Sequence, residues 1–466
     1  MNGVLALSGT AQARLIREGQ ISSEELIAAH LARIDQVNPA LNAAVEVLRA
    51  QAPGAARATD ARRSRGEALG PLEGVPFSVK DSIEVKGSGC SAGTLGYRNN
   101  PPAARDATLV RRLREAGAIP LARTNLPDLL FAFESDNLIH GRTSNPYDPA
   151  RSSGGSSGGE AALIAACGSP FGLGSDAAGS VRLPAHYCGI AAIKPTSGRL
   201  PRTGHVPPAG GWIEMLWQIG PMARHVEDLW TVLPILLGPD GEDCTVIPMP
   251  FLHESAAARP RVAFFTDNGI LPADRETAAA VLNAAKTLQN RGFEVEEFRP
   301  PGIEQSYDLE MKLLGADGGD GLREFAAGIG SDRTHPLLEG WLAKLGRHRT
   351  SLAGFAACWA ELDGFRASMH RALQRCDVIL SPVAAQPAVL HGTSIADDIF
   401  PGFSYTMTHN LTGWPAAVVR CGTSPGGLPI GIQIAAGPWR EDLALQVASA
   451  LEESHGGWQT PEIAEC

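Results

Sequence analysis

The sequence lacks long hydrophobic runs: no stretch holds the roughly 18 consecutive apolar residues that a membrane-spanning helix needs. The opening residues MNGVLALSGTAQARL contain only a short apolar run and no positively charged start, so we expect no secretory signal peptide. Basic residues are not in excess, because the formal net charge is −10. These features argue against an integral membrane protein and against a nucleic-acid partner, while a peripheral amphipathic patch stays open.

Paired cysteines are also missing. The eight cysteines, at positions 90, 167, 188, 244, 358, 376, 421 and 466, form no CxxC pair, and several stand in apolar surroundings. We therefore expect reduced, buried thiols in a cytoplasmic protein, and no metal site. Hydrophobic residues make up 44% of the chain and charged residues 19%, proportions typical of a globular protein with a large core.

Predicted strands and helices alternate along the chain. The segment 74–85, GVPFSVKDSIEV, favours a strand, and 106–124 favours a helix followed by a strand. The same order recurs at RVAFFTD, the long helical segment 273–292, and FEVEEF. Such alternation predicts an α/β fold, in which residues 1–466 form a single large domain. Its core is a twisted, mixed and mostly parallel β-sheet with helices on both faces.

The most unusual segment is the octet SSGGSSGG at residues 152–159, whose composition is that of a flexible linker. It stands between a turn-like stretch and a predicted helix with no change in composition, which disfavours a linker between domains. The octet also matches GxSxG, the nucleophile elbow of Ser-His-Asp hydrolases, with Ser156 as nucleophile and His391 or His409 as base. The preceding NPYDPARS does not favour the strand that an elbow needs, so this class stays an alternative.

Two other motifs are weaker. The GxGxxA pattern at 172–177 is followed by neither the helix nor the acidic residue of a dinucleotide site. The DGGDG segment at 317–321 has too few oxygen ligands after it for calcium and favours a turn. We therefore expect no cofactor.

A longer pattern runs through the octet. Residues 154–196, GGSSGGEAALIAACGSPFGLGSDAAGSVRLPAHYCGIAAIKPT, resemble the signature of the amidase signature family. Other blocks follow in the order of that family: PLEGVPFSVKDS, DATLVRRLREAGAIPLARTNLPDL, GRTSNPYDP, GPMARHVEDL, CDVILSPVAAQPA, NLTGWPAAVVRCG and GLPIGIQIAAG. The resemblance covers nearly the whole chain, with a signature core at 74–225. Stretches such as FAFESDNLIHGRTSNPYD are most similar to the fatty-acid amide hydrolase branch.

The resemblance implies the amidase signature fold and a triad of serine, cis-serine and lysine. By motif position the nucleophile is Ser180 in AAGSVR, the proton relay is Ser156 in GGSSGG, and the base is Lys80 in FSVKDS. In the family the relay serine follows a cis peptide bond. An unassisted serine hydroxyl is a poor nucleophile and needs an adjacent base, and no histidine stands in these motifs.

Lys80 can act as a base only when it is neutral, so burial must lower its pKa. The residues around it in the sequence are apolar: Val75, Phe77, Val79 and Ile83. Taken alone, Lys80 beside Asp81 would be an ordinary surface lysine or an ion-pair partner. Within the full pattern, Ser156 relays the proton of Ser180 to Lys80 and then delivers a proton to the leaving amine.

The resemblance also implies an oxyanion hole made by the backbone amides of Ala177, Ala178, Gly179 and Ser180. The family has two glycines before the nucleophile, so the methyl group of Ala178 is a departure that is expected to narrow the pocket or restrict the loop. Supporting roles are expected for Ser153, Ser157, Asp176 and Arg182. Without the pattern, the two serines would be ordinary turn residues.

Two groups of apolar side chains are candidates for the substrate pocket. By resemblance, Leu130 and Phe131 border the acyl site. Trp212, Met215 and Trp217 form a cluster in a glycine-flanked segment that lines a hydrophobic pocket or simply packs in the core. The pocket is expected to depend on the segments 200–220 and 310–405, where the family varies.

These features predict a serine hydrolase that cleaves linear amide C–N bonds through an acyl-enzyme on Ser180, and that also hydrolyses esters and carbamates. Its expected partner is a small-molecule amide, ester or carbamate, and its oligomeric state is left open, with a homodimer as one option. Two alternatives come from other classes. One is the glutaminase subunit of a tRNA-dependent amidotransferase, which the family includes, and the other is a pseudo-enzyme that only binds.

Overall fold

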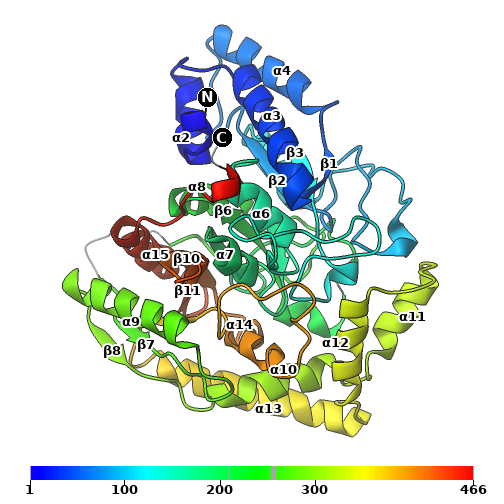
Figure 1. Cartoon of the computed structure of the whole chain (residues 1–466), viewed down its shortest axis with the longest axis vertical. Coiled ribbons are helices and arrows are strands. Elements are labelled where there is room, and N and C mark those ends of the chain that lie inside the picture. Colours follow the sequence, from blue (N-terminus) through cyan, green and yellow to red (C-terminus); the bar gives the residue numbers. More distant parts are fainter. Residues whose placement is uncertain (1, 209, 253–258, 465–466) are drawn as a thin grey trace.

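A computed structural model describes residues 2–208, 210–252 and 259–464. Within these residues, eleven strands form one sheet in the order β1-β3-β2-β4-β6-β5-β10-β11-β9-β7-β8 (Figure 1). The strands are β1 (Ala44–Val47), β2 (Pro76–Lys80), β3 (Ile119–Thr124), β4 (Phe171–Asp176), β5 (Ala191–Lys194), β6 (Gln218–Ala223), β7 (Val262–Phe264), β8 (Val295–Glu297), β9 (Val378–Pro382), β10 (Ala416–Thr423) and β11 (Pro429–Ala436). Strands β1–β6 from the first half of the chain and β7–β11 from the second half join through the β5–β10 pair into one continuous sheet, so the chain forms a single α/β domain.

The sheet is mixed, as expected. Parallel pairs occur in two blocks, β3-β2-β4 and β9-β7-β8. The pairs between these blocks, from β4 through β6, β5, β10 and β11 to β9, are antiparallel, and so is β1-β3. The expected parallel pairing therefore belongs to the two blocks and not to the centre. One reason is that β10 and β11 are joined by a short turn, a connection that only antiparallel neighbours allow.

Helices lie between most of the strands. They are α1 (Asn2–Leu5), α2 (Gly9–Arg17), α3 (Ser23–Leu41), α4 (Ala52–Ser64), α5 (Thr108–Glu115), α6 (Gly158–Ala165), α7 (Arg182–Cys188), α8 (Val226–Leu236), α9 (Arg275–Asn290), α10 (Ser306–Leu314), α11 (Asp320–Gly328), α12 (Pro336–Gly346), α13 (Leu352–Ala372), α14 (Ser404–Leu411) and α15 (Glu441–His455). Short 3-10 helices are η1 (Leu95–Tyr97), η2 (Asp128–Leu130), η3 (Trp212–Leu216), η4 (Ile303–Gln305), η5 (Phe400–Phe403) and η6 (Glu462–Ala464).

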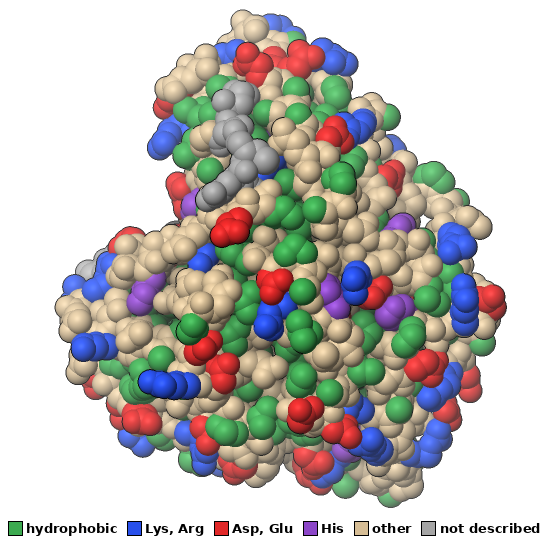
Figure 2. Space-filling model, in the orientation of Figure 1, with side chains coloured by type: hydrophobic (Ala, Val, Ile, Leu, Met, Phe, Trp, Pro, Cys, Tyr) green, Lys and Arg blue, Asp and Glu red, His purple; other side chains and the backbone are tan. Residues whose placement is uncertain are grey.

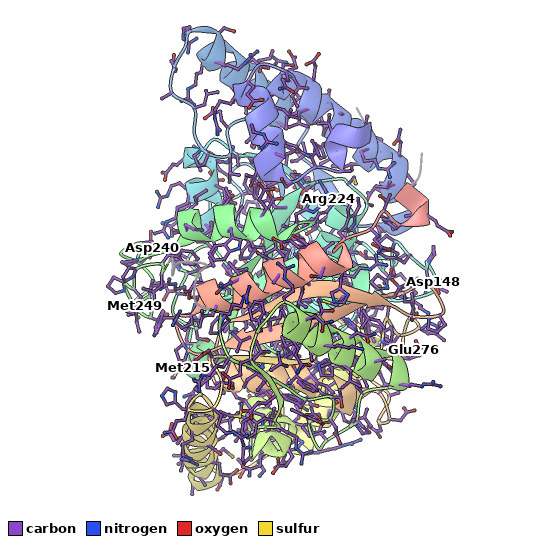
Figure 3. The ribbon with its side chains drawn as sticks, turned by 90° about the vertical axis from the view of Figure 1, so that its left-hand side faces the viewer. Asp148, Met215, Arg224, Asp240, Met249 and Glu276 are labelled. Atoms are coloured by element: carbon purple, nitrogen blue, oxygen red, sulfur yellow. The ribbon has the colours of Figure 1, made fainter. Side chains whose placement is uncertain are left out.

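Helices cover both faces of the sheet. On one face lie α8, α9 and α15, which form the layer nearest the viewer in Figure 3. On the other face, α6 and α7 pack against the central strands. Strand β11 shows the division: Gln433 Oε1 accepts a hydrogen bond of 2.7 Å from Arg182 of α7, whereas Ile432 and Ile434 alternate with it and point to the opposite face. Helices α2 to α4 and α10 to α13 lie at opposite ends of the molecule (Figure 1).

The surface and the cysteines agree with a globular chain. No helix among the described residues combines the length and the apolarity that crossing a membrane requires. Lys and Arg side chains are interspersed with Asp and Glu over the face shown in Figure 2. Of the described cysteines, Cys244 is exposed, the others are buried, and all are free thiols. Cys466 lies outside the described residues.

The Gly/Ser octet is a buried turn and not a linker between domains. All eight residues are buried, and the chain enters α6 at Gly158. Gly159 shows why side chains are excluded here. A Cβ atom at this position would lie 2.6 Å from the carbonyl oxygen of Asn125 and 2.7 Å from that of Ala43, and both of these atoms belong to the backbone. The octet is therefore clamped between segments that are distant in the sequence.

We predict that Gly159→Ala strongly destabilises the protein, because rigid backbone on two sides cannot move away from a new methyl group. Gly364, inside α13, is the matched control, since a Cβ atom there would meet nothing within 4 Å. Gly364→Ala should stabilise the fold by about 0.5–1 kcal/mol through helix propensity. Thermal unfolding of both variants tests this. Equal melting temperatures for the two variants would contradict the clamped turn.

Candidate active site

Lys80 stands at the centre of the candidate site. It is the last residue of β2 and its side chain is fully buried. The Nζ atom lies 2.6 Å from Ser156 Oγ, 3.1 Å from Ser175 Oγ and 3.3 Å from the carbonyl oxygen of Ser175. The Gly155–Ser156 peptide bond is cis. A lysine from one strand thus meets a serine of the octet and a serine near the end of β4.

Burial sets the protonation state of Lys80. Removal of the ammonium group from water lowers the pKa of Lys80 to about 7, although the nearby carboxylates of Asp176 and Glu160 oppose the change. Burial likewise raises the pKa of Glu160 to about 7, against hydrogen bonds from Ser78 and Thr124. A substantial fraction of Lys80 is therefore a neutral amine near pH 7, as a base must be.

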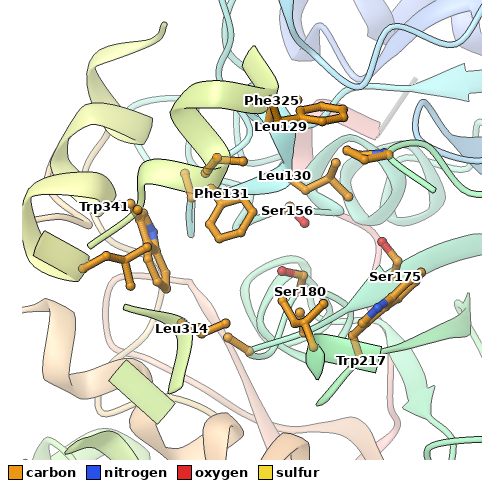
Figure 4. A pocket seen from close by; sticks show the side chains of 18 of the residues that line it. Leu129, Leu130, Phe131, Ser156, Ser175, Ser180, Trp217, Leu314, Phe325 and Trp341 are labelled. Atoms are coloured by element: carbon orange, nitrogen blue, oxygen red, sulfur yellow. The ribbon is translucent and has the colours of Figure 1, made fainter. Parts of the chain in front are cut away.

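Ser180 is the more accessible of the two predicted catalytic serines. Its exposed fraction is 8%, against 1% for Ser156 and 0% for Lys80. Both hydroxyl groups point into the same space in Figure 4, and both residues line one cavity. The amide of Ser157 donates a 3.1 Å hydrogen bond to the Ser180 carbonyl, which fixes the octet against the nucleophile loop.

The loop before Ser180 departs from the predicted oxyanion hole in one respect. The Gly179 amide donates a 2.8 Å hydrogen bond to Asp176 Oδ1, so it is not free to bind an oxyanion. Among the described residues, nothing accepts from the amides of Ala177, Ala178 or Ser180. The Asp176 carboxylate therefore holds the Gly179 amide, and the amides of Ala177, Ala178 and Ser180 remain candidates for the predicted oxyanion hole.

Gly179 is required for a different reason. Its φ is +119°, in the region that favours glycine, and a Cβ atom there would collide with Thr406 Oγ1. The Thr406 hydroxyl donates a 2.7 Å hydrogen bond to the Ala178 carbonyl. The Ala178 side chain borders the cavity and packs in an apolar cluster with Phe133 and Leu183. The methyl group in place of the family glycine is thus accommodated in the cavity wall.

Asp176 and Arg182 hold this loop through a fully buried ion pair. Arg182 Nη2 lies 2.8 Å from Asp176 Oδ1, and Nε lies 2.9 Å from Oδ2. Burial alone would raise the pKa of Asp176, but the charge and hydrogen bonds of Arg182 hold it well below its usual value. Arg182 also donates to the Thr406 carbonyl at 2.8 Å and to Asn410 Oδ1 at 2.6 Å. The pair thus ties the loop to α14.

In the described part of the chain, neither of the two predicted supporting serines forms a hydrogen bond with the Ser156 hydroxyl. Ser157 Oγ lies 3.4 Å from the Ser175 carbonyl, and Ser153 Oγ donates to the Thr143 carbonyl at 3.4 Å. The hydroxyl that joins Ser156 around Lys80 is that of Ser175, which sequence reasoning missed although it adjoins Asp176. Ser135 was also missed: its Oγ donates to the Gly154 carbonyl at 3.0 Å and accepts from the Gly158 amide at 2.9 Å.

The histidines expected for a Ser-His-Asp site are engaged elsewhere. His391 Nε2 lies 3.2 Å from the Pro149 carbonyl, and the His409 ring stacks on Trp414. Within the described residues, no histidine forms a hydrogen bond with the hydroxyl of Ser156 or Ser180. The contacts of Ser156 therefore favour lysine as its base. No group of three or more His, Cys, Asp or Glu side chains in the described part of the chain can hold a metal ion.

Ser156 and Ser180 border a cavity of about 460 Å³. Of the residues predicted to bind the substrate, Leu130, Phe131 and Trp217 line this cavity. Met215 does not: its side chain is 49% exposed and lies at the margin of the molecule in Figure 3. The side chain of Trp212 lies outside the described residues.

The cavity wall is largely apolar. Phe131 and Trp341 meet edge to face, with ring centroids 6.1 Å apart, on the side of the cavity opposite Trp217 (Figure 4). Asp317 also borders the cavity, but its carboxylate accepts hydrogen bonds from the amides of Gly319 and Gly321, and so closes the DGGDG turn. The segment 200–220 contributes His205, Pro207, Pro208, Gly210, Ile213 and Trp217, and the segment 310–405 contributes Leu314, Asp317, Gly319, Gly321, Leu322, Phe325, Trp341 and Leu345.

A buried lysine and two serines thus lie together beside one largely apolar cavity. Comparison with known proteins gives the family: the Amidase family profile matches residues 25–445, and the chain belongs to this family. Indoleacetamide hydrolase of Bradyrhizobium diazoefficiens is 32% identical, over 97% of this chain and 88% of its own.

Two further comparisons cover other branches of the family. A glutamyl-tRNA(Gln) amidotransferase subunit of Synechococcus is 33% identical, over 96% of this chain and 97% of its own. A solved structure of fatty acid amide hydrolase superposes with a TM-score of 0.88 at 25% identity, over 97% of this chain and 86% of that one. The amidase signature resemblance is therefore confirmed, while overall identity is similar for relatives of different named activity.

We predict that Asp176→Asn lowers the free energy of unfolding by about 3–5 kcal/mol, because it leaves the buried Arg182 guanidinium without a counter-charge. Denaturant unfolding measures the change. The control is Glu115→Gln, which removes one partner of the exposed Arg111–Glu115 pair and should have little effect. A similar decrease in the free energy of unfolding for both variants would show that the buried pair contributes no more to stability than the exposed pair.

Proposed function

We propose that this protein is a hydrolase of linear amides that works through an acyl-enzyme on Ser180, with Ser156 as proton relay and Lys80 as base. The observation that carries the proposal is the 2.6 Å contact between the buried Lys80 Nζ and Ser156 Oγ beside a cavity that also exposes Ser180. The named activity of the related indoleacetamide hydrolase supports amides as substrates.

In the proposed mechanism, protons pass from Ser180 through Ser156 to Lys80, and then back through Ser156 to the leaving group. Neutral Lys80 takes the proton of Ser156 as Ser156 takes that of Ser180, and Ser180 Oγ attacks the amide carbonyl carbon. The oxygen of the tetrahedral intermediate is stabilised by the amides of Ala177, Ala178 and Ser180. The proton then returns through Ser156 to the amide nitrogen as the C–N bond breaks, and an amine leaves. Water attacks the acyl-enzyme by the same relay and releases a carboxylic acid.

The lining of the cavity favours substrates with an apolar acyl group. Its aromatic and aliphatic lining and its volume of about 460 Å³ fit an aryl group or an alkyl chain of moderate length. Esters and carbamates carry the same carbonyl centre and can enter the same acyl-enzyme route. The proposed activity therefore includes both classes.

A second candidate function is that of a glutaminase component of an amidotransferase, favoured by the 33% identity to the Synechococcus relative. Free glutamine carries an ammonium and a carboxylate, which need charged partners. The described acidic side chains lining the cavity are Asp176, paired with Arg182, and Asp317, which accepts from two amides. The apolar lining thus favours the amidase. Glutaminase activity with free L-glutamine, exceeding that on arylamides, would favour the glutaminase.

We predict that Ser180→Ala lowers kcat/KM on an anilide, a fatty amide, a p-nitrophenyl ester and a carbamate by about 10³-fold or more, because the attacking oxygen is removed. Ser153→Ala is the matched control within the octet, since the Ser153 hydroxyl donates to the Thr143 carbonyl at 3.4 Å and, among the described residues, forms no hydrogen bond with Lys80, Ser156 or Ser180. It should keep activity within about tenfold. Wild-type turnover of every substrate by Ser180→Ala would refute the proposed nucleophile.

The pH dependence should report Lys80. Below a pKa of about 7 the amine is protonated and cannot accept a proton, so kcat/KM should fall about tenfold per pH unit there and level off above it. Lys80→Met should lose activity about 10²- to 10⁴-fold and lose this dependence. Lys194 is the control, because burial also lowers its pKa to about 7 while its Nζ contacts the Pro195 carbonyl. Lys194→Met should keep the decrease in kcat/KM below pH 7. Loss of that decrease in Lys194→Met, and not in Lys80→Met, would assign the titration to Lys194.

A further inference from the structure

His205 lies on the far side of the Ser175 hydroxyl from Lys80, the proposed base. It belongs to a loop that is hydrogen-bonded to the segment that follows β2. The Val206 amide donates a 2.7 Å hydrogen bond to the Ser82 carbonyl, and the Glu84 amide donates a 2.9 Å bond to the Gly204 carbonyl. The His205 ring, in a side chain that is 7% exposed, packs against Trp217 with centroids 4.6 Å apart. The imidazole is thus held in one place at the border of the cavity.

The two ring nitrogens have different neighbours. His205 Nδ1 lies 3.1 Å from the Pro207 carbonyl, and Nε2 lies 3.2 Å from Ser175 Oγ. A carbonyl oxygen can only accept, so Nδ1 must carry the hydrogen. Burial lowers the pKa of His205 to about 3, and the charges of Lys80 and Arg202 act in the same direction, so the ring is neutral at neutral pH. Nε2 then has a free lone pair and accepts the hydroxyl hydrogen of Ser175.

This assignment determines how Lys80 uses its hydrogens. A neutral amine has two N–H donors and one lone pair, and three oxygen atoms surround Nζ. The Ser175 carbonyl accepts one hydrogen. Ser175 Oγ, whose own hydrogen is bound to His205, accepts the other. The lone pair therefore remains for the hydroxyl of Ser156, the atom at the shortest distance.

We infer that His205 is a positioning residue: it holds the Ser175 hydroxyl as an acceptor for Lys80, and so keeps the Lys80 lone pair available for the Ser156 proton. The inference rests on the proposed function, in which Lys80 is the base. Without an acceptor at position 205, the Ser175 hydroxyl is free to turn and donate to Lys80. It then competes with Ser156 for the one lone pair.

The test compares two substitutions of similar size at one position. His205→Leu removes the acceptor, whereas the side-chain oxygen of His205→Gln can still accept from Ser175. We expect kcat for an arylamide to fall about tenfold to 100-fold in His205→Leu, and about tenfold less in His205→Gln. Both change the cavity border, so KM should shift alike in the two variants. If His205→Leu fails to fold, His205→Ala takes its place, because it also lacks the acceptor and adds no bulk.

Ser175→Ala completes a double-mutant cycle. It removes the competing hydroxyl, so adding it to His205→Leu should raise kcat above that of His205→Leu alone, a gain that a merely structural role for His205 cannot produce. Equal kcat for the Leu and Gln variants, or additive losses in the cycle, would overturn the inference. Lys80→Met, assayed in parallel, separates the two proposals. Its loss of activity upholds the base whatever the His205 variants do, and its retained activity would overturn the proposed function itself.

Discussion

The candidate site depends on the burial of a single amine. Lys80 is fully enclosed at the end of β2, and loss of hydration lowers its pKa to about 7. A neutral amine has a lone pair that can accept a proton, provided that no neighbouring group already donates a hydrogen bond to it. The oxygen atoms around it come from segments distant in the sequence, Ser156 from the octet and Ser175 from β4. The fold is thus needed both to exclude water and to place these oxygen atoms around the amine.

A second constraint acts on the nucleophile loop. Asp176 must stay charged in the interior, and the paired Arg182 stabilises that charge by holding both of its oxygens. The same carboxylate accepts from the amides of Gly179 and Val181, at 2.8 and 3.1 Å. The ion pair therefore fixes the Gly179 and Val181 amides, and leaves those of Ala177, Ala178 and Ser180 for the proposed oxyanion hole. Because Arg182 also forms hydrogen bonds with α14, the conformation of this loop depends on the packing of the whole domain.

The parts of the site that could be predicted are those marked by local chemistry. Glycines around Ser156 indicate a turn without room for side chains, and apolar neighbours indicate that Lys80 is buried. What could not be predicted depends on contacts across the fold. Nothing local marks His205, whose role comes from a loop fastened beside β2. Met215 and Trp217 are equally apolar and two residues apart, yet Met215 is exposed and Trp217 is buried. Likewise, strand alternation in the sequence predicted the α/β class but not the antiparallel centre of the sheet.

The cavity wall carries one further constraint, because two of its residues are in an unfavourable backbone conformation. Leu129 and Leu130 have φ of +50° and +67°, values that non-glycine residues adopt only when the surroundings enforce them. The enforcement comes from both sides: the Leu129 amide donates to the Ala92 carbonyl at 3.0 Å, and Asp128 Oδ2 accepts from the His335 amide at 2.9 Å. His335 caps α12, which carries the cavity residue Trp341. The strained turn and the helix that faces it are therefore held together, so the shape of this side of the cavity depends on both.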